Sequence, residues 1–367
     1  MLKVHRWFIL VGLVFIVFIA LSTDFKSIFM GNEFQKWVKH TVKEMAEGGI
    51  SKATLQQFQK ELKEPLTELS QNKITDKKLY TLKVDDNLIL KSRKFFQDNL
   101  EELQLLSKQY NVNPNTVTAV VGYGSLFGEN VPKNQLVQVL ATLAFNNQDS
   151  AKYKHELFEF LKLVDSKAIP FNVLGYNDGG FTQLHILPSF YADTAKDGNG
   201  DNTIDLLSSK EDVLASGSNL LKNNGWEFNK PWGSLVSLPV GQDFSQKQGS
   251  AHMQDFAAWE SLGIKLHNKK DTPPSDAASM LLLLDSPNNG VLLHTNFSVI
   301  YKIKGDLQES LTVLSLSSQL QEFNTQINYK QQNVKALKKH QKVYRSKGPK
   351  KDDMPVPAKY RYLESIK

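Results

Sequence analysis

The chain has 367 residues, is 41% hydrophobic and contains no cysteine. This composition excludes a disordered tail, a disulfide framework, thiolate catalysis and thiolate metal sites, and the length allows two or three domains. The formal net charge is +6, but residues 325–367 alone hold 12 Lys+Arg against 3 Asp+Glu. The rest of the chain therefore lacks a basic excess, and it shows no basic patch interleaved with aromatic residues. We expect no nucleic-acid partner.

The first 24 residues have the pattern of a membrane-targeting segment. Lys3, His5 and Arg6 precede an apolar run over residues 7–21. This run is long for a signal-peptide core and short for a spanning helix, which needs about 20 residues. We expect an uncleaved anchor over residues 7–23; the alternative is a signal peptide that is removed near Ala20 or Ser22. In both cases the basic end stays in the cytoplasm. The sequence therefore predicts a periplasmic protein, anchored in the inner membrane.

Helical patterns follow up to about residue 225. Ser51 is expected to cap one helix, and Pro114 suits the first turn of another. Residues 136–145, 153–164 and 209–225 continue the helical pattern, whereas residues 169–202 have the Gly, Asn, Asp and aromatic content of binding loops. The packing helices before residue 111 show two apolar stripes at three- and four-residue spacing: Phe34, Val38, Val42 and Met45, and then Phe96, Leu100, Leu103 and Leu106.

The C-terminal third differs in composition from the helical part. The segments "SLVSLPV", "SMLLLLD" and "GVLLHTNFSVIYKI" are rich in aliphatic and β-branched residues between turn signals, which predicts a small β-containing subdomain. A last helix is expected over residues 307–323. Residues 325–367 are low in apolar residues, and they predict a solvated, mobile tail. The alternative for this tail is attraction to an anionic polymer or to lipid headgroups.

The order of several motifs resembles the lytic murein transglycosylase B family, most strongly over residues 95–232. These motifs are "QYNVNPNTVTAVVGYGSLFGEN", "LATLAFNN", "LGYNDGGFTQLHILPSFY", "DGNGDNTIDLLSSKEDVLASGSNLLKNNGW" and "PW". The resemblance implies a mainly α fold in which a lysozyme-like helical core lies beside an N-terminal helical domain and a small β subdomain. The boundaries that we expect are 1–24 for the targeting segment, 30–111 for the N-terminal helices, 112–235 for the core, 236–305 for the β subdomain, 306–324 for the closing helix and 325–367 for the tail.

The resemblance also implies a reaction. The family cleaves peptidoglycan between N-acetylmuramic acid and N-acetylglucosamine and leaves a 1,6-anhydro sugar. This chemistry needs a carboxyl group that first protonates the glycosidic oxygen and then accepts the proton of the C6 hydroxyl. The family's Glu lies four residues before the Gly that is Gly128 here, so its position falls on Gly124. Gly122 and Gly124 are unusual inside a helix, because each glycine costs the helix about 1 kcal/mol relative to Ala. Relaxed selection or close helix packing is the favoured interpretation of both.

Other groove positions of the family pattern also differ. The Ser that follows Gly in the groove loop is Tyr176 here, and the Gln before Met-Pro-Ser is His185. A Tyr becomes Leu220, and a Tyr-Asn pair becomes Ile303 and Lys304. These changes around intact scaffold motifs favour a murein-binding or scaffold pseudoenzyme whose cleavage is lost or strongly reduced, with cell-wall enzymes as candidate partners.

Two alternatives stay open. In one, the chain is a working lytic transglycosylase in which Asp178 or Glu129 replaces the missing acid; in the other, the groove binds a protein. The residues expected at the glycan groove, some of which could instead be core aromatics, are Tyr123, Phe127, Asn146, Tyr176, His185 and Tyr191.

The segment "DGNGDNTID" resembles a calcium-binding loop. Asp197, Asn199 and Asp201 alternate, and the Thr203 carbonyl is next in line, so four oxygens could converge on one hard cation. Asn202 takes the sixth position, where the backbone must be left-handed. The twelfth position is a Ser instead of a Glu, but the family resemblance implies structural Ca²⁺ here with a longer reach to Glu211 or Asp212. The alternative is a loop of Asx turns without an ion.

Overall fold

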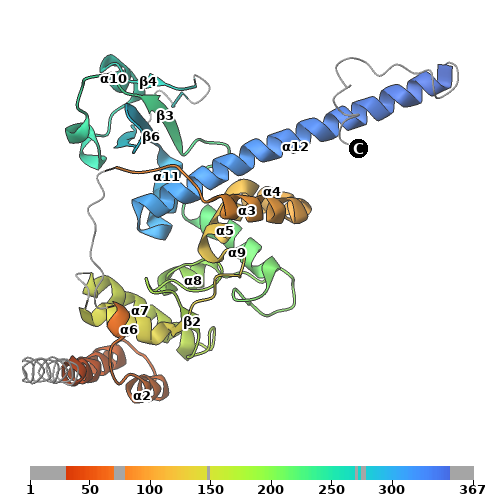
Figure 1. Cartoon of the computed structure of the whole chain (residues 1–367). Coiled ribbons are helices and arrows are strands. Elements are labelled where there is room, and N and C mark those ends of the chain that lie inside the picture. The colour runs from red at the N-terminus through yellow and green to blue at the C-terminus, as the bar shows by residue number, and fades with distance from the viewer. Residues whose placement is uncertain (1–29, 70–78, 147–148, 269–271, 274–277, 348–367) are drawn as a thin grey trace, which may run out of the picture. The chain divides into compact units, whose positions relative to one another are not determined.

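The structure is a computed structural model, and it describes residues 30–69, 79–146, 149–268, 272–273 and 278–347. The chain divides into two compact units, which are described separately. The first unit comprises Met1–Lys77 and Gly124–Asn223, and the second comprises Lys78–Tyr123 and Asn224–Lys367. Both are mainly helical in their described parts (Figure 1), as the resemblance predicts.

The first unit begins with a helix over residues 30–47. The elements that follow are α2 (Lys52–Glu61), η1 (Thr67–Leu69), β1 (Asn134–Gln135), α6 (Leu136–Asn146), α7 (Ser150–Asp165), β2 (Leu174–Gly175), α8 (Pro188–Thr194) and α9 (Lys210–Asn223). β1 and β2 form a short antiparallel pair.

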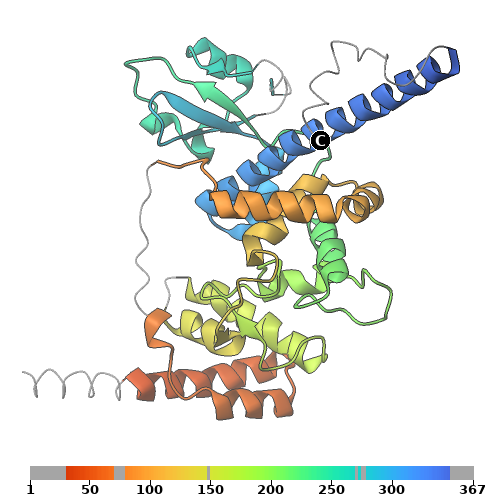
Figure 2. The same cartoon turned by 45° about the vertical axis from the view of Figure 1, so that its right-hand side comes forward.

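The core of the first unit lies around α6 and α7, which are drawn side by side in Figures 1 and 2. Almost every side chain of α6 is buried, so this helix has no polar face. Burial of each large aliphatic side chain stabilises the unit by about 1.5–3 kcal/mol. Phe34 and Trp37 from the first helix stack together and meet Phe145 edge-on. Phe34, Val38 and Met45 of the predicted stripe are buried, but Thr41 is buried where the stripe has Val42, which is only half-buried.

The end of α7 holds the start of α2. The Ser51 side chain accepts a hydrogen bond from the Thr54 amide, which confirms the predicted N-cap. The Asp165 carboxylate accepts hydrogen bonds from the Ser51 amide at 2.7 Å and from the Ser51 hydroxyl at 2.6 Å. These bonds lower the pKa of Asp165.

The second unit combines helices with a small sheet. Its elements are α3 (Asp86–Asp98), α4 (Leu100–Tyr110), α5 (Pro114–Ser125, whose last two residues belong to the first unit), β3 (Gly233–Ser237), η2 (Ser245–Lys247), η3 (Ser250–His252), α10 (Phe256–Ser261), β4 (Lys265–Leu266), β5 (Met280–Leu283), β6 (Asn289–Leu293), α11 (Thr295–Lys304) and α12 (Leu307–Lys347).

The sheet of the second unit has the strand order β4-β3-β6-β5, and all its pairs are antiparallel. Its core residues are Val236, Phe244, Trp259, Ile264, Leu281 and Leu292. Trp259 is the largest of them, and its indole N–H donates a hydrogen bond to the Ser279 carbonyl at 3.2 Å. The predicted small β subdomain is therefore present.

Three elements differ from the expectation. The apolar stripe from Phe96 to Leu106, expected on one helix, is divided between α3, which ends at Asp98, and α4, which begins at Leu100. The segment "GVLLHTNFSVIYKI" is only half strand: β6 ends at Leu293, and α11 begins at Thr295. Phe297, Ile300 and Ile303 recur at three-residue spacing on the buried side of α11, and this helical period outweighs the β-branched content. The last helix, expected to end at residue 323, continues to Lys347 as α12, whose second half extends away from the rest of this unit (Figures 1 and 2).

The targeting segment and part of the tail cannot be compared with the structure. The predicted anchor over residues 7–23 lies outside the described residues, and so do residues 348–367. Within the described ranges, no helix has both the length and the apolar character that a bilayer crossing requires.

Candidate functional site

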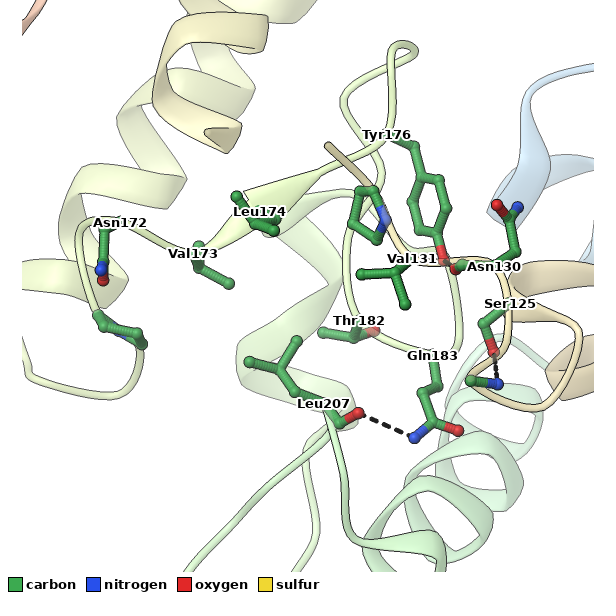
Figure 3. A pocket seen from close by; sticks show the side chains of 13 residues that line it. Ser125, Asn130, Val131, Asn172, Val173, Leu174, Tyr176, Thr182, Gln183 and Leu207 are labelled. Carbon is green, nitrogen blue, oxygen red and sulfur yellow. Dashed lines mark hydrogen bonds between the residues drawn. The ribbon is translucent and has the colours of Figure 1, made fainter. Parts of the chain in front are cut away.

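The candidate site lies where α5 ends. After Ser125 the backbone turns sharply: Leu126, Phe127 and Gly128 all have positive φ, at 50°, 59° and 88°. The Ser125 hydroxyl accepts a hydrogen bond from the Gly128 amide at 3.0 Å, which holds this turn (Figure 3). Left-handed backbone costs a non-glycine residue about 1–2 kcal/mol, and such strain concentrates at functional sites. Glu129 follows the turn, is exposed, and lies beyond the helix end, as expected.

Gly124, the position at which the resemblance places the family Glu, packs directly against another backbone segment. A Cβ at this position would lie 2.7 Å from the Gln183 carbonyl oxygen, 2.9 Å from the Leu184 carbonyl carbon and 3.0 Å from the Leu184 oxygen. Separations below 3.0 Å are not seen between real Cβ atoms and their neighbours. The space that a side chain at position 124 needs is therefore filled by main chain.

The segment that fills this space is a tight turn. Phe181 and Ile186 exchange backbone hydrogen bonds at 2.9 and 3.1 Å, and Thr182 and His185 between them have φ of 63° and 50°. The Gln183 amide also donates to the Leu206 carbonyl at 3.0 Å. The turn is thus fixed at both sides, and it cannot move away from Gly124 without loss of these bonds.

His185 connects this turn to Asp178 and Tyr176. Its Nδ1 lies 3.2 Å from the Gly124 carbonyl oxygen, and its Nε2 lies 2.9 Å from both carboxylate oxygens of Asp178. The imidazole also stacks on the Tyr176 ring, with 4.0 Å between the centroids. Both carboxylate oxygens of Asp178, a candidate replacement acid, therefore face the His185 ring.

A pocket of about 340 Å³ opens beside these residues, all of it within the first unit (Figure 3). Its lining consists of Ser125, Gly128, Asn130, Val131, Pro132, Pro170, Asn172, Val173, Leu174, Tyr176, Thr182, Gln183 and Leu207. None of these residues carries a carboxyl group or any other charged side chain. Neither Asp178 nor Glu129 lines the pocket.

The polar groups of this pocket are neutral amides and hydroxyls. The side-chain amide of Gln183 donates a hydrogen bond to the Leu207 carbonyl at 2.9 Å, and the Tyr176 hydroxyl donates one to the Asn130 carbonyl at 2.7 Å. Burial, and then the negative charge of Asp178, raise the pKa of Tyr176 to about 12. A general acid works best with a pKa near the working pH, so this hydroxyl is a poor proton donor. The pocket is therefore uncharged, and apolar side chains make up much of its lining.

The other residues predicted for the groove lie elsewhere. Asn146 is exposed at the end of α6, and Tyr191 is buried, with its ring stacked on Phe181 at 5.6 Å. Tyr123 belongs to the second unit, where the Lys304 ammonium lies 5.7 Å from its ring centroid. Phe127 is half-buried in the strained turn. Their role toward a glycan stays a prediction.

Sequence reasoning missed most of the pocket lining, which comes from four segments of the chain, around residues 125–132, 170–176, 182–183 and 207. Pro170, Asn172 and Thr182 belong to the stretch whose composition indicated binding loops, but nothing in the sequence singled them out. Asn130 is the last residue of the quoted helix motif, and Val131 follows it. Only Tyr176 was named in advance for this place.

The predicted calcium loop has the expected backbone. Gly200 and Asn202 have φ of 78° and 66°, which confirms the left-handed sixth position. The two Asp197 oxygens accept hydrogen bonds from the Gly200 and Asn202 amides at 2.7 and 2.8 Å. Asn199 and Asp201 likewise accept from the amides two residues ahead. These are Asx turns, and each carboxylate oxygen keeps a further lone pair for a cation.

The acids expected to close the calcium site have other partners. Asp212 is only 1% exposed, and its two oxygens accept from the Gly198 and Asp205 amides, both at 2.8 Å. Glu211 lies 3.2 Å from the Lys210 ammonium. Among the described residues, no group of three or more His, Asp or Glu side chains is arranged to hold a metal ion. The oxygen donors of the loop suit Ca²⁺, but the closing acid is not in place, so calcium binding stays a prediction.

The chain matches the family described as transglycosylase SLT domain over residues 33–304. It is 32% identical over 119 residues to the membrane-bound lytic murein transglycosylase B of Escherichia coli (strain K12). That alignment covers 32% of this chain and 33% of the relative, about a third of each.

Solved structures share the fold. The lytic transglycosylase SltB3 of Pseudomonas aeruginosa, in complex with NAG-anhNAM-pentapeptide, superposes with a TM-score of 0.66 at 23% identity and covers 78% of this chain and 79% of that one. The Escherichia coli lytic transglycosylase Slt35 in complex with calcium gives a TM-score of 0.64 at 18% identity, over 78% of this chain and 93% of that one. At these identities the likeness shows the fold alone.

Proposed function

Because the chain belongs to the transglycosylase SLT domain family, whose match spans residues 33–304, we propose that it binds peptidoglycan glycan strands in the periplasm and cleaves them weakly or not at all. One observation carries this proposal: the pocket at the end of α5 is lined by neutral side chains only, without a carboxyl group. The relative in Escherichia coli is named a murein transglycosylase, and one solved relative holds a NAG-anhNAM-pentapeptide, which supports the ligand class.

The loss of cleavage follows from the chemistry of the reaction. A group that donates a proton and then takes one back contributes about 10²–10⁴-fold to the rate. Gly124 cannot supply this group, and the Tyr176 hydroxyl has a pKa of about 12. The main chain of Gln183 and Leu184 also fills the space in which a carboxylate side chain would stand. Binding survives such changes, because hydroxyls and amides suffice to hold a sugar chain.

A working enzyme with a relocated acid is the alternative. Asp178 is the candidate, because its side chain is about half exposed, but both of its oxygens face the His185 imidazole. If this carboxylate were the proton donor, Asp178→Asn would abolish cleavage. Under our proposal the variant changes nothing in the products, because there is no cleavage to lose.

The test uses the full chain, purified in detergent, with insoluble peptidoglycan sacculi. We expect the protein to sediment with the sacculi and to release no 1,6-anhydro-muropeptides above a heat-inactivated sample. Release at an ordinary enzymatic rate would overturn the loss of cleavage, and failure to sediment would overturn glycan binding. The latter outcome favours the third possibility, a groove that binds a protein partner.

Two pocket variants connect the binding to the site. Tyr176→Ala removes the ring that lines the pocket and stacks on His185, and Asn172→Ala removes an exposed amide from the lining. Both should weaken co-sedimentation several-fold. Tyr329→Ala is the matched control, because this exposed tyrosine lies on α12 and outside the pocket. Equal loss of binding in the control would mean that the pocket is not the glycan site.

A further inference from the structure

A second and larger hollow lies entirely within the second unit. Its volume is about 840 Å³, within the range of about 300–1,000 Å³ that is typical of small-molecule sites. It shares no lining residue with the pocket beside Gly124. The start of α5, the segment before β3 and the first half of α12 supply most of its walls.

The walls of this hollow are polar but almost uncharged. Neutral amides and hydroxyls dominate, and two indole rings, Trp226 and Trp232, stand among them. The cation of the lining, Lys230, is paired with Glu227 at 2.5 Å, and Glu322 is the acid. Such walls do not attract a phosphate or another anion. The amides and hydroxyls of the lining are Asn113, Asn115, Thr116, Asn229, Asn268, Ser315, Ser317, Ser318, Gln319, Gln321 and Thr325.

A hydrogen-bond network fixes the walls of the hollow. The Trp232 indole N–H donates to the Ser318 hydroxyl at 2.9 Å. The Asn115 amide donates to the Ser317 carbonyl and hydroxyl, each at 3.0 Å, and the Thr116 and Ser317 hydroxyls are 2.8 Å apart. Groups held in this way lose little conformational entropy when a ligand binds. The walls are therefore preorganised.

Not every polar group beside the hollow can reach a ligand. Ser315 belongs to the lining and is only 6% exposed, and its hydroxyl oxygen is buried without a hydrogen-bond partner among the described residues. An oxygen buried in this way is closed to a ligand in the hollow. The lining groups that can contact a ligand are the partly and fully exposed ones, among them the side-chain amides of Gln319 and Gln321.

We propose that this hollow, formed by Gln319 and Gln321 of α12 together with Trp232 and the start of α5, is a second binding site that takes an uncharged carbohydrate chain. Sugars present many hydroxyl groups to amides and hydroxyls, and their C–H faces pack on indole rings. An anionic ligand finds no unpaired cation in this lining. The inference does not depend on the function of the pocket beside Gly124.

The test measures the affinity of the full chain, in detergent, for two uncharged tetrasaccharides by calorimetry. Tetra-N-acetylchitotetraose carries acetamido groups, and cellotetraose does not. Binding of either one supports the proposal, and their ratio reports whether acetamido groups are recognised. If neither binds at millimolar concentration, the proposal is overturned.

Gln321→Ala is the informative variant. It removes an exposed side-chain amide of the lining and leaves the core intact, so the melting temperature should stay the same, while the affinity falls about threefold to tenfold through one lost ligand hydrogen bond. Gln326→Ala is the matched control, because Gln326 is also an exposed glutamine of α12, but it lies outside the hollow. This control should bind the sugars like the wild type.

Gln319→Ala is the second pocket variant, since its side chain is half-buried on α12 and its loss leaves the core intact. It should also weaken binding. Unchanged affinity in both pocket variants would overturn the proposal. Tyr176→Ala separates this site from the pocket beside Gly124: it should leave tetrasaccharide binding in this hollow unchanged, whereas binding lost only in Tyr176→Ala would assign the sugar to the other pocket.

Discussion

A side chain at position 124 should destabilise the first unit and should not create an active enzyme. For Gly124→Ala, two terms oppose each other. Alanine favours the helix by about 1 kcal/mol over glycine. The new Cβ, however, would lie 2.7 Å from the Gln183 oxygen and 2.9 Å from the Leu184 carbon, and both atoms belong to the backbone. A rotamer change cannot relieve this contact.

The net effect follows from these two terms. Overpacking of a well-filled site costs about 1–3 kcal/mol, and a clash with fixed main chain belongs at the upper end of this range. After the helix term is subtracted, we expect Gly124→Ala to lose about 1–2 kcal/mol, or ~2–8 °C in melting temperature. Gly124→Glu adds a charged side chain in the same place and should lose at least as much.

Thermal unfolding of the full chain in detergent is the measurement, with Gly31→Ala as control. Gly31 lies in the helix over residues 30–47, and a Cβ there would meet nothing within 4 Å, so this variant should be neutral or slightly stabilised. The Gly124→Glu protein should also release no anhydro-muropeptides from sacculi. A Gly124→Glu variant that melts like the wild type and cleaves peptidoglycan would refute the reasoning about the filled space.

Two further variants test the described contacts. Glu156 is 4% exposed and accepts hydrogen bonds from the Ser189 amide and hydroxyl at 2.9 and 2.8 Å. Glu156→Ala should therefore lower the free energy of unfolding, measured with denaturant, by about 1–3 kcal/mol. The control is Glu159→Ala, which breaks the helix pair with Lys162 and should cost less than about 0.5 kcal/mol. Burial lowers the pKa of His294 to about 4, below its unfolded value of about 6.5, so the unfolded chain takes up the proton first. The free energy of unfolding should therefore be highest above pH 6.5, and it should be about 2 kcal/mol lower at pH 5. His294→Gln should remove this dependence of the free energy of unfolding on pH. An equal pH dependence in the variant would exclude His294 as its source.

Local sequence signals predicted much of the helical framework. Ser51 caps α2, Pro114 opens α5, and the apolar run of α6 is buried, because each depends on neighbours within one turn or on one continuous face. The last helix is different. Residues 324–347 are mostly polar and lack an apolar stripe, so amphipathic spacing gave no reason to extend α12 beyond residue 323.

The candidate site was predictable only in part. The resemblance of the helix-ending motif to the family pattern pointed to Gly124 as the expected position of the acid, because that position is counted along the chain from Gly128. The filled space beside it did not follow, since the contact joins Gly124 to Gln183 and Leu184, about 60 residues further along the chain. The same holds for the pocket, which gathers residues from loops around 130, 172 and 207.

The glycine at position 124 and the turn at residues 182–185 support each other. Without a side chain on the helix, the Gln183 and Leu184 backbone can approach to contact, and His185 then bonds to the Gly124 carbonyl while it faces Asp178. With the turn in place, an acid at position 124 would require the backbone to move and would break these bonds. A single substitution therefore cannot restore the proton donor at low cost. The contacts between Gly124 and the turn are thus the physical reason behind the proposal of binding without cleavage.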